Sequence, residues 1–175
     1  MTLTPSLNSP GALYRKLERE SYRAFHARSR IHKADHFFNF CVTAHAMRDY
    51  VLEHLGIEKI DQQQFHEQWS KVPSLAAARD IANSTKHFQL REPPPTKAVR
   101  RHKSKFIEIY ANGRGEVKFA EVEGPDITVH LSDGAAMPLH EFTREIMSYW
   151  RAYLAQHGIK VRRQSVTQLI GDAAK

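Results

Sequence analysis

The fold is decided by one stretch, residues 31–55, which reads IHKADHFFNFCVTAHAMRDYVLEHL. Its apolar residues return every three to four positions, which is the spacing of one face of an α-helix. Gly56 follows at once, and a glycine directly after the last periodic residue is typical of a helix C-terminus. The stretch therefore predicts a long amphipathic helix with a core-facing stripe. The stripe consists of Phe37, Phe40, Ala44, Met47, Val51 and Leu55.

Helical periodicity also marks the chain on both sides of this segment. Before it, apolar residues recur over residues 10–28, with Ser9 as the expected N-cap and a proline in the first turn. After it, a third helix is predicted over residues 73–88. Residues 57–72 are glutamine-rich and fit either a short packing helix or an ordered loop. Together these segments predict an antiparallel helical bundle over residues 10–90.

Beyond the bundle the periodicity changes from helical to alternating. A proline-rich basic connector, residues 91–104, precedes a segment of β-hairpins and a closing amphipathic helix, residues 105–158. Residues 159–175 form a basic tail. The prediction is one α+β domain over residues 1–175, in which the bundle is followed by a small antiparallel β-hairpin or three-stranded sheet and a C-terminal helix. The expected strands are residues 106–110, 117–122 and 127–131.

The composition favours a polyanionic partner. The chain of 175 residues carries 26 Lys and Arg against 19 Asp and Glu, a formal net charge of +7, and RNA is a candidate ligand for such an excess. No stretch reaches the ~18 continuous apolar residues of a membrane helix, and no signal peptide is recognisable. We therefore expect a cytosolic protein without a membrane partner. The single cysteine, Cys41, lies in an apolar run and is expected to be a buried hydrophobe.

The helix over residues 31–55 carries a broad polar face opposite its apolar stripe. A solvated face is what any amphipathic helix shows. Apolar side chains interrupt this face, however, which indicates that a neighbouring helix or subunit covers part of it, and covered polar groups need partners. The face consists of Asp35, Asn39, His45 and Asp49.

The third predicted helix offers such partners. Arg79, Asn83 and Lys86 lie within about 60° of one another on a helical projection, and Asp80 and His87 flank them. Histidine can move protons near neutral pH, and arginine and lysine can stabilise developing phosphate charge. These residue types fit phosphodiester chemistry without a metal. The alternative for His87 is a histidine in the last helical turn that interacts with the helix dipole.

Two phrases in these helices resemble a group of small uncharacterised bacterial proteins. The phrases are Phe38-Asn39-Phe40-Cys41-Val42-Thr43-Ala44-His45 with Asp49-Tyr50, and Ala82-Asn83-Ser84-Thr85-Lys86-His87-Phe88. The resemblance covers roughly residues 31–90 and brings no established activity with it.

Asn83 followed by His87 is also distantly similar to the Arg-Asn-x-x-x-His signature of HEPN domains. That resemblance implies a helical, usually dimeric fold and a metal-independent ribonuclease of a toxin or phage-defence system. The arginine of the signature would fall on position 82, where this chain has Ala82, so Arg79 is the expected substitute one turn earlier. If Arg79 points elsewhere, the fold is HEPN-like without the ribonuclease.

The leading hypothesis is thus a HEPN-like protein that processes RNA. His87 would be the general acid and base, Asn83 and Lys86 would orient phosphate, and Arg79 would stabilise charge. The supporting residues would be Asp35, Asn39, His45, Asp49 and Asp80. The competing hypothesis is a non-catalytic interaction or dimerisation module that binds a protein partner or a second copy of the chain through the same helices.

A basic segment between the proline run and the first strand is a second candidate for RNA binding. It would contact phosphates rather than read bases, because no aromatic residue is interleaved with its cations; a solvated linker is the alternative. No metal site or cofactor is predicted, since the chain lacks a HExxH motif, a cysteine pair, a Walker sequence and a GxGxxG loop. The basic segment consists of Lys97, Arg100, Arg101, His102, Lys103 and Lys105.

Overall fold

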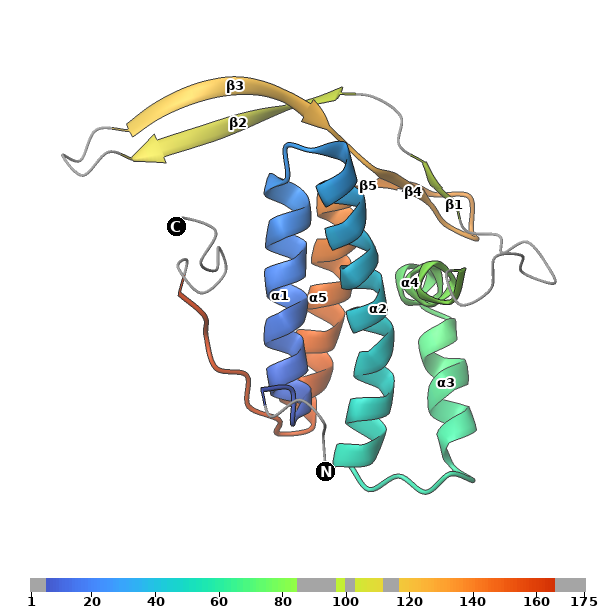
Figure 1. Ribbon diagram of the computed structural model, residues 1–175. Coiled ribbons are helices and arrows are strands. Elements are labelled where there is room, and N and C mark those ends of the chain that lie inside the picture. The colour runs from blue at the N-terminus through green and yellow to red at the C-terminus, as the bar shows by residue number, and fades with distance from the viewer. Residues whose placement is uncertain (1–5, 85–96, 100–102, 112–116, 166–175) are drawn as a thin grey trace.

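A computed structural model of the chain describes residues 6–84, 97–99, 103–111 and 117–165, and between residues 97 and 123 it describes the backbone only. This part folds as an α+β protein (Figure 1), as the sequence predicts. Its helices are α1 (Pro10–His26), α2 (Arg30–His54), α3 (Gln62–Ser70), α4 (Pro73–Ser84) and α5 (Leu139–Gln156). Its strands are β1 (Lys97–Val99), β2 (Lys103–Ala111), β3 (Val117–Pro125), β4 (Thr128–His130) and β5 (Ala136–Pro138). Within these residues, no helix combines the length and apolar character that crossing a membrane requires.

Helices α1, α2 and α5 lie side by side and enclose the core (Figure 1). The predicted N-cap of α1 is confirmed, because Ser9 Oγ accepts a hydrogen bond from the Ala12 N–H at 3.2 Å. The predicted stripe of α2 is buried along most of its length, and Phe37 meets Phe142 of α5 with ring centroids 5.9 Å apart. Gly56 ends α2 with φ +65°, a conformation that favours glycine. The long helix predicted over residues 31–55 is therefore present.

The segment over residues 57–72 contains the short helix α3. Trp69 anchors it, because its fully buried ring lies 5.5 Å from that of Trp150 and 5.9 Å from that of Phe65. Helix α4 follows at Pro73 and packs against α2. The predicted continuation of this helix to residue 88 lies outside the described residues.

The strands form two sheets rather than one. The predicted hairpin is present, with β2 and β3 paired antiparallel from Lys103–Pro125 to Ala111–Val117. The predicted third strand is present as β4, but it pairs with β1 and β5 in a separate sheet of order β1-β4-β5. Each of these three strands is three residues long, too short to leave a clear alternating pattern in the sequence. β1 lies within the segment expected to be a connector.

Strand β4 joins this small sheet to the helical core. Ile127, Val129 and Leu131 are buried at alternate positions, so one face of the strand packs inward. The Leu139 N–H donates to the Ile127 carbonyl at 2.9 Å, which fixes the start of α5 beside the strand. The sheet therefore sets the position at which α5 enters the helical layer.

Candidate functional site

The predicted catalytic residues lie on α4 and beyond its described end. Arg79, Asp80 and Asn83 are half-exposed residues of α4, whereas Lys86 and His87 lie outside the described residues. The proton-transfer role of His87 beside Arg79 and Asn83 stays a prediction.

Arg79 forms an ion pair next to its own position. Its Nε and Nη2 donate to Asp80 Oδ1 at 3.0 and 2.8 Å, and its Nη1 donates to Ser70 Oγ at 3.0 Å. The guanidinium thus links α4 to the end of α3. To contact a phosphate, Arg79 would have to exchange these bonds, and its substitution for the missing arginine of the HEPN signature stays a prediction.

The predicted supporting residues of α2 face solvent for the most part. Asp35, Asn39 and Asp49 are exposed, and their side chains form no hydrogen bond within the described part of the chain. His45 is half-buried. No described hydrogen bond joins the three exposed side chains to Arg79, and their action as one site stays a prediction.

Sequence reasoning did not single out the buried arginine between α2 and α4. Arg48 is 2% exposed, its guanidinium lies 5.9 Å from the centre of the Trp69 ring, and its Nη2 donates to the Leu75 carbonyl at 3.3 Å. Burial, followed by repulsion from Arg79, lowers the pKa of Arg48 to about 10. Asp49 acts in the opposite direction. The position of Arg48 indicates a packing role.

The predicted nucleic-acid-binding segment lies in the β region. Lys97 belongs to β1, and Lys103 and Lys105 belong to β2, where only the backbone is described. Arg100 and Arg101 lie outside the described residues. Their contact with phosphates stays a prediction.

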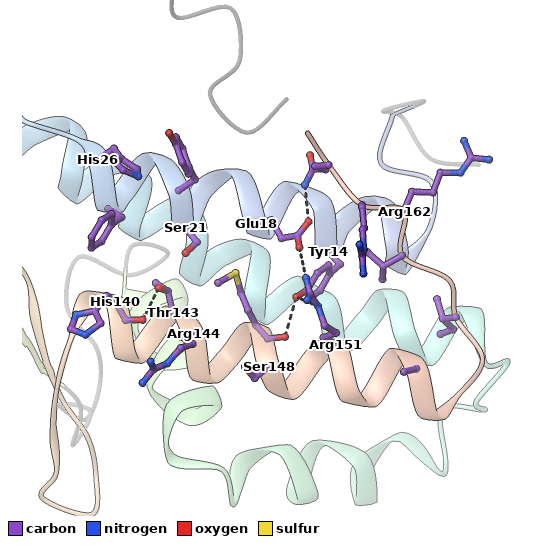
Figure 2. A pocket seen from close by; sticks show the side chains of 18 residues that line it. Tyr14, Glu18, Ser21, His26, His140, Thr143, Arg144, Ser148, Arg151 and Arg162 are labelled. Atoms are coloured by element: carbon purple, nitrogen blue, oxygen red, sulfur yellow. Dashed lines mark hydrogen bonds and ion pairs between the residues drawn. The ribbon is translucent and has the colours of Figure 1, made fainter. Parts of the chain in front are cut away.

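A groove of about 940 Å³ opens between α1, α5 and residues 159–165 (Figure 2). Each helix lines it with residues spaced four, seven or eleven positions apart, which share one helical face. The α1 wall includes Tyr14, Glu18, Ser21, Tyr22 and Phe25, with His26 at its end. The α5 wall includes His140, Thr143, Arg144, Met147, Ser148 and Arg151. The C-terminal segment adds Arg162, Arg163 and Gln164.

The C-terminal segment is held against α1 by the side chain of Gln164. Its Nε2 donates to the Arg15 carbonyl and to Glu18 Oε2, both at 2.8 Å. Its Oε1 accepts from Arg19 Nη1, also at 2.8 Å. Both ends of the amide are therefore used, and the preceding residues Arg162 and Arg163 are kept at the rim of the groove.

Arg151 lines the groove and reaches from α5 to α1. Its Nε donates to Tyr14 Oη at 3.2 Å and its Nη2 donates to Glu18 Oε1 at 2.8 Å (Figure 2). Tyr14 in turn donates to the Met147 carbonyl at 3.2 Å. Burial raises the pKa of Tyr14, so its phenol is neutral at physiological pH. Tyr14 raises the pKa of Arg151, which keeps a full positive charge in the groove.

The remaining arginines of the groove have no acidic partner in the described part of the chain. Arg144, Arg162 and Arg163 are exposed, and none forms an ion pair with a described residue. Among the described residues that line the groove, Glu18 is the single carboxylate, and it is already paired with Arg151. The groove consequently carries a positive potential that an anionic ligand would neutralise.

Aromatic rings gather at the end of the groove where α1 finishes. Tyr22 and His26 have ring centroids 4.2 Å apart, and Phe25 meets His26 edge-on at 5.0 Å. The Phe25 side chain is 37% exposed although it is large and apolar. His140 lies opposite, at the start of α5 (Figure 2). This end can offer ring faces to a ligand, while the other end offers guanidinium groups.

Only one wall of this groove could be predicted from the sequence. Arg144 and Arg151 are seven positions apart and therefore lie on one face of the closing helix, away from its apolar stripe. The α1 wall, however, precedes them by more than 100 residues. Nothing in a single sequence pairs two such distant stripes.

No protein-family model, curated protein or solved structure matches this chain. Since one fold can host many activities, the functional conclusion depends on the chemistry of the groove.

Proposed function

We propose that the protein binds RNA in the groove between α1, α5 and residues 159–165. The observation that carries the proposal is the convergence of Arg144, Arg162 and Arg163 on one cavity, without an acidic partner among the described residues. Guanidinium groups match the geometry of phosphate oxygens and stay charged throughout the physiological pH range. A phosphate backbone would supply the acceptors and the negative charge that these side chains lack.

The shape of the site strengthens the electrostatic argument. Exposed arginines on a convex surface are ordinary, but a concave site lined by one sign of charge focuses the field and concentrates an oppositely charged ligand. The net charge of +7 adds a long-range attraction for a polyanion. An acidic protein segment would meet the same field, so the test must include one.

The test is the salt dependence of binding to a fluorescently labelled RNA of about ten nucleotides. The double variant R162A/R163A removes two charges from the groove. Its matched control, K59A/K71A, removes two charges from exposed positions outside the groove. We expect the groove variant to bind more weakly and to lower the slope of log K against log salt by about 1.4, while the control keeps the wild-type slope.

Equal effects of the two double variants would overturn the proposal, because they would indicate attraction by the overall charge alone. Displacement of the RNA by poly-glutamate at the same charge concentration would instead assign the groove to an acidic protein partner. The proposal is supported if poly-glutamate does not displace the RNA and if R162A/R163A binds the RNA more weakly than the wild type.

The cleavage of RNA is a separate matter from its binding. A metal-independent ribonuclease centred on Asn83 and His87, a HEPN-like bundle, a homodimer and a cytosolic location all stay predictions. RNA held in the groove would be compatible with cleavage elsewhere on the molecule, but binding does not require it.

A further inference from the structure

The two ends of the groove differ in chemistry. One end is formed by Tyr22, Phe25, His26 and His140, and the other by Arg151, Arg162 and Arg163. Figure 2 labels His26 and His140 at the first end and Arg151 and Arg162 at the second. Between them lie shorter polar side chains and Arg144. A ligand that fills the groove therefore meets rings at one end and cations at the other.

The distance between the ends follows from the helix that forms one wall. His140 and Arg151 are 11 positions apart on α5, which corresponds to about 16 Å of helix axis. Stacked bases along a strand are about 3.4 Å apart, so the groove is about five base steps long. A single nucleotide would not reach both ends.

We propose that the ligand of the groove is an unpaired nucleic-acid strand whose bases stack at the Tyr22 and Phe25 end. This inference rests on the proposed RNA binding and narrows its substrate class. The rings of Tyr22 and Phe25 offer stacking surfaces to bases, and Arg144, Arg162 and Arg163 contact the phosphates that follow. Aromatic platforms combined with a basic groove are how single strands are bound without sequence preference.

A duplex does not use these features. Its bases are stacked and paired inside the helix, so a ring on a protein wall cannot reach their faces. A duplex would contact only the arginines at the rim. The proposal therefore predicts that the rings, and not the arginines, distinguish a strand from a duplex.

The experiment is a thermodynamic cycle. It compares the affinity of ligands with and without bases for proteins with and without the Tyr22 and Phe25 rings. The probes are a labelled oligo-adenylate of about six nucleotides and an abasic oligomer with the same number of phosphates. The protein variants are the wild type, Y22L/F25L, and the conservative variant Y22F. Circular dichroism and thermal unfolding confirm that each variant is folded, and I60A serves as a control at an exposed apolar position outside the groove.

The wild type should bind the abasic oligomer about tenfold more weakly than the oligo-adenylate, and Y22L/F25L should bind the two probes almost equally. I60A should behave as the wild type, whereas Y22F, which keeps the ring, should restore the preference for the oligo-adenylate that Y22L/F25L loses. Affinity should rise with strand length and level off near six nucleotides.

The inference is overturned if loss of the bases weakens binding equally in the wild type and in Y22L/F25L, or if a duplex binds as tightly as the strand in both. In that case a response to R162A/R163A would still uphold RNA binding. If no probe responds to R162A/R163A, the proposed function fails as well.

Discussion

Lys160 approaches Gly11 more closely than any side chain at position 11 would permit. A Cβ on Gly11 would lie 2.6 Å from the Lys160 carbonyl oxygen, a backbone atom that cannot rotate away. The glycine therefore allows the chain after α5 to lie directly on α1. The bonds of Gln164 hold the same segment a turn further along. Arg162 and Arg163 owe their place at the groove to these two contacts.

We expect Gly11→Ala to displace this segment and to weaken RNA binding. The clash should cost about 1–3 kcal/mol of unfolding free energy, and affinity should fall toward that of R162A/R163A. Urea unfolding and fluorescence anisotropy measure the two effects. Gly56→Ala is the matched control. The φ of +65° at Gly56 strains an alanine by about 1 kcal/mol, and the added methyl group meets no other atom and lies away from the groove. A loss of affinity in both variants would show that stability, and not the segment, governs binding.

Glu18→Gln should tighten RNA binding, although it removes an ion pair. Glu18 neutralises Arg151 across 2.8 Å, so the substitution frees a positive charge in the groove, while the oxygen of the new amide can still accept from Gln164 Nε2. The ion pair is partly exposed, and its loss should cost at most about 1 kcal/mol of stability. Glu67→Gln makes the same change in net charge on α3, outside the groove. Affinity that rises equally in both variants, or falls in Glu18→Gln, would contradict the proposal that the positive charge of the groove holds the RNA.

Arg48→Met should be as stable as the wild type or more stable at neutral pH, by about 1 kcal/mol. Arg48 is buried, and it donates to the Leu75 carbonyl. Because Leu75 lies inside α4, its carbonyl also accepts a helical N–H and keeps a partner when Arg48 is replaced. RNA affinity should stay unchanged, since Arg48 does not line the groove. A loss of more than about 2 kcal/mol would show that the charge itself holds α2 and α4 together.

The difference in unfolding free energy between Arg48→Met and the wild type should depend on pH in a defined direction. The folded pKa of Arg48, about 10, lies well below its ordinary value, so the folded state binds this proton less tightly than the unfolded chain. The contribution of Arg48 to stability therefore rises with pH through this window and is least favourable below pH 10. The advantage of Arg48→Met should shrink when urea unfolding is repeated at about pH 10.5. A constant difference would argue against the lowered pKa.

The ribonuclease hypothesis makes its own prediction. If His87 is the general acid and base, metal-free RNA cleavage should be lost in a folded His87→Ala variant while RNA affinity is retained. Cleavage products on a denaturing gel and anisotropy separate the two properties. Arg79→Ala would then show whether the Asp80 ion pair or phosphate contact is its role. Cleavage that persists in His87→Ala would remove the HEPN-type mechanism from consideration.

The helices could be predicted from the sequence because their patterns are local. The α2 stripe, the Ser9 cap and the Gly56 terminus each depend on residues within a few positions, and each is present. The strands β1 and β5 could not be predicted, since three residues do not show a period. Trp69 explains why residues 62–70 form a helix, but its partner Trp150 is 81 positions away.

The candidate site was harder to predict than the fold. The polar residues of α2 and α4 share helical faces, as the spacing indicates, yet Asp35, Asn39 and Asp49 face solvent and Arg79 pairs with its neighbour. The groove arises where α1, α5 and the C-terminal segment meet, and that meeting depends on tertiary contacts such as the one at Gly11. A charge excess can be read from composition, whereas its convergence on one cavity cannot.

The central claim is that RNA lies in the groove between α1 and α5, and cross-linking with peptide mapping tests it most directly. The full chain would be irradiated with a 4-thiouridine-labelled single-stranded RNA, digested, and its nucleotide-bearing peptides identified by mass spectrometry. We predict that the cross-linked peptides come from residues 14–26 and 140–164, and that R162A/R163A reduces their yield. Cross-links confined to residues 97–111 would contradict the account and would move RNA binding to the basic segment of β1 and β2.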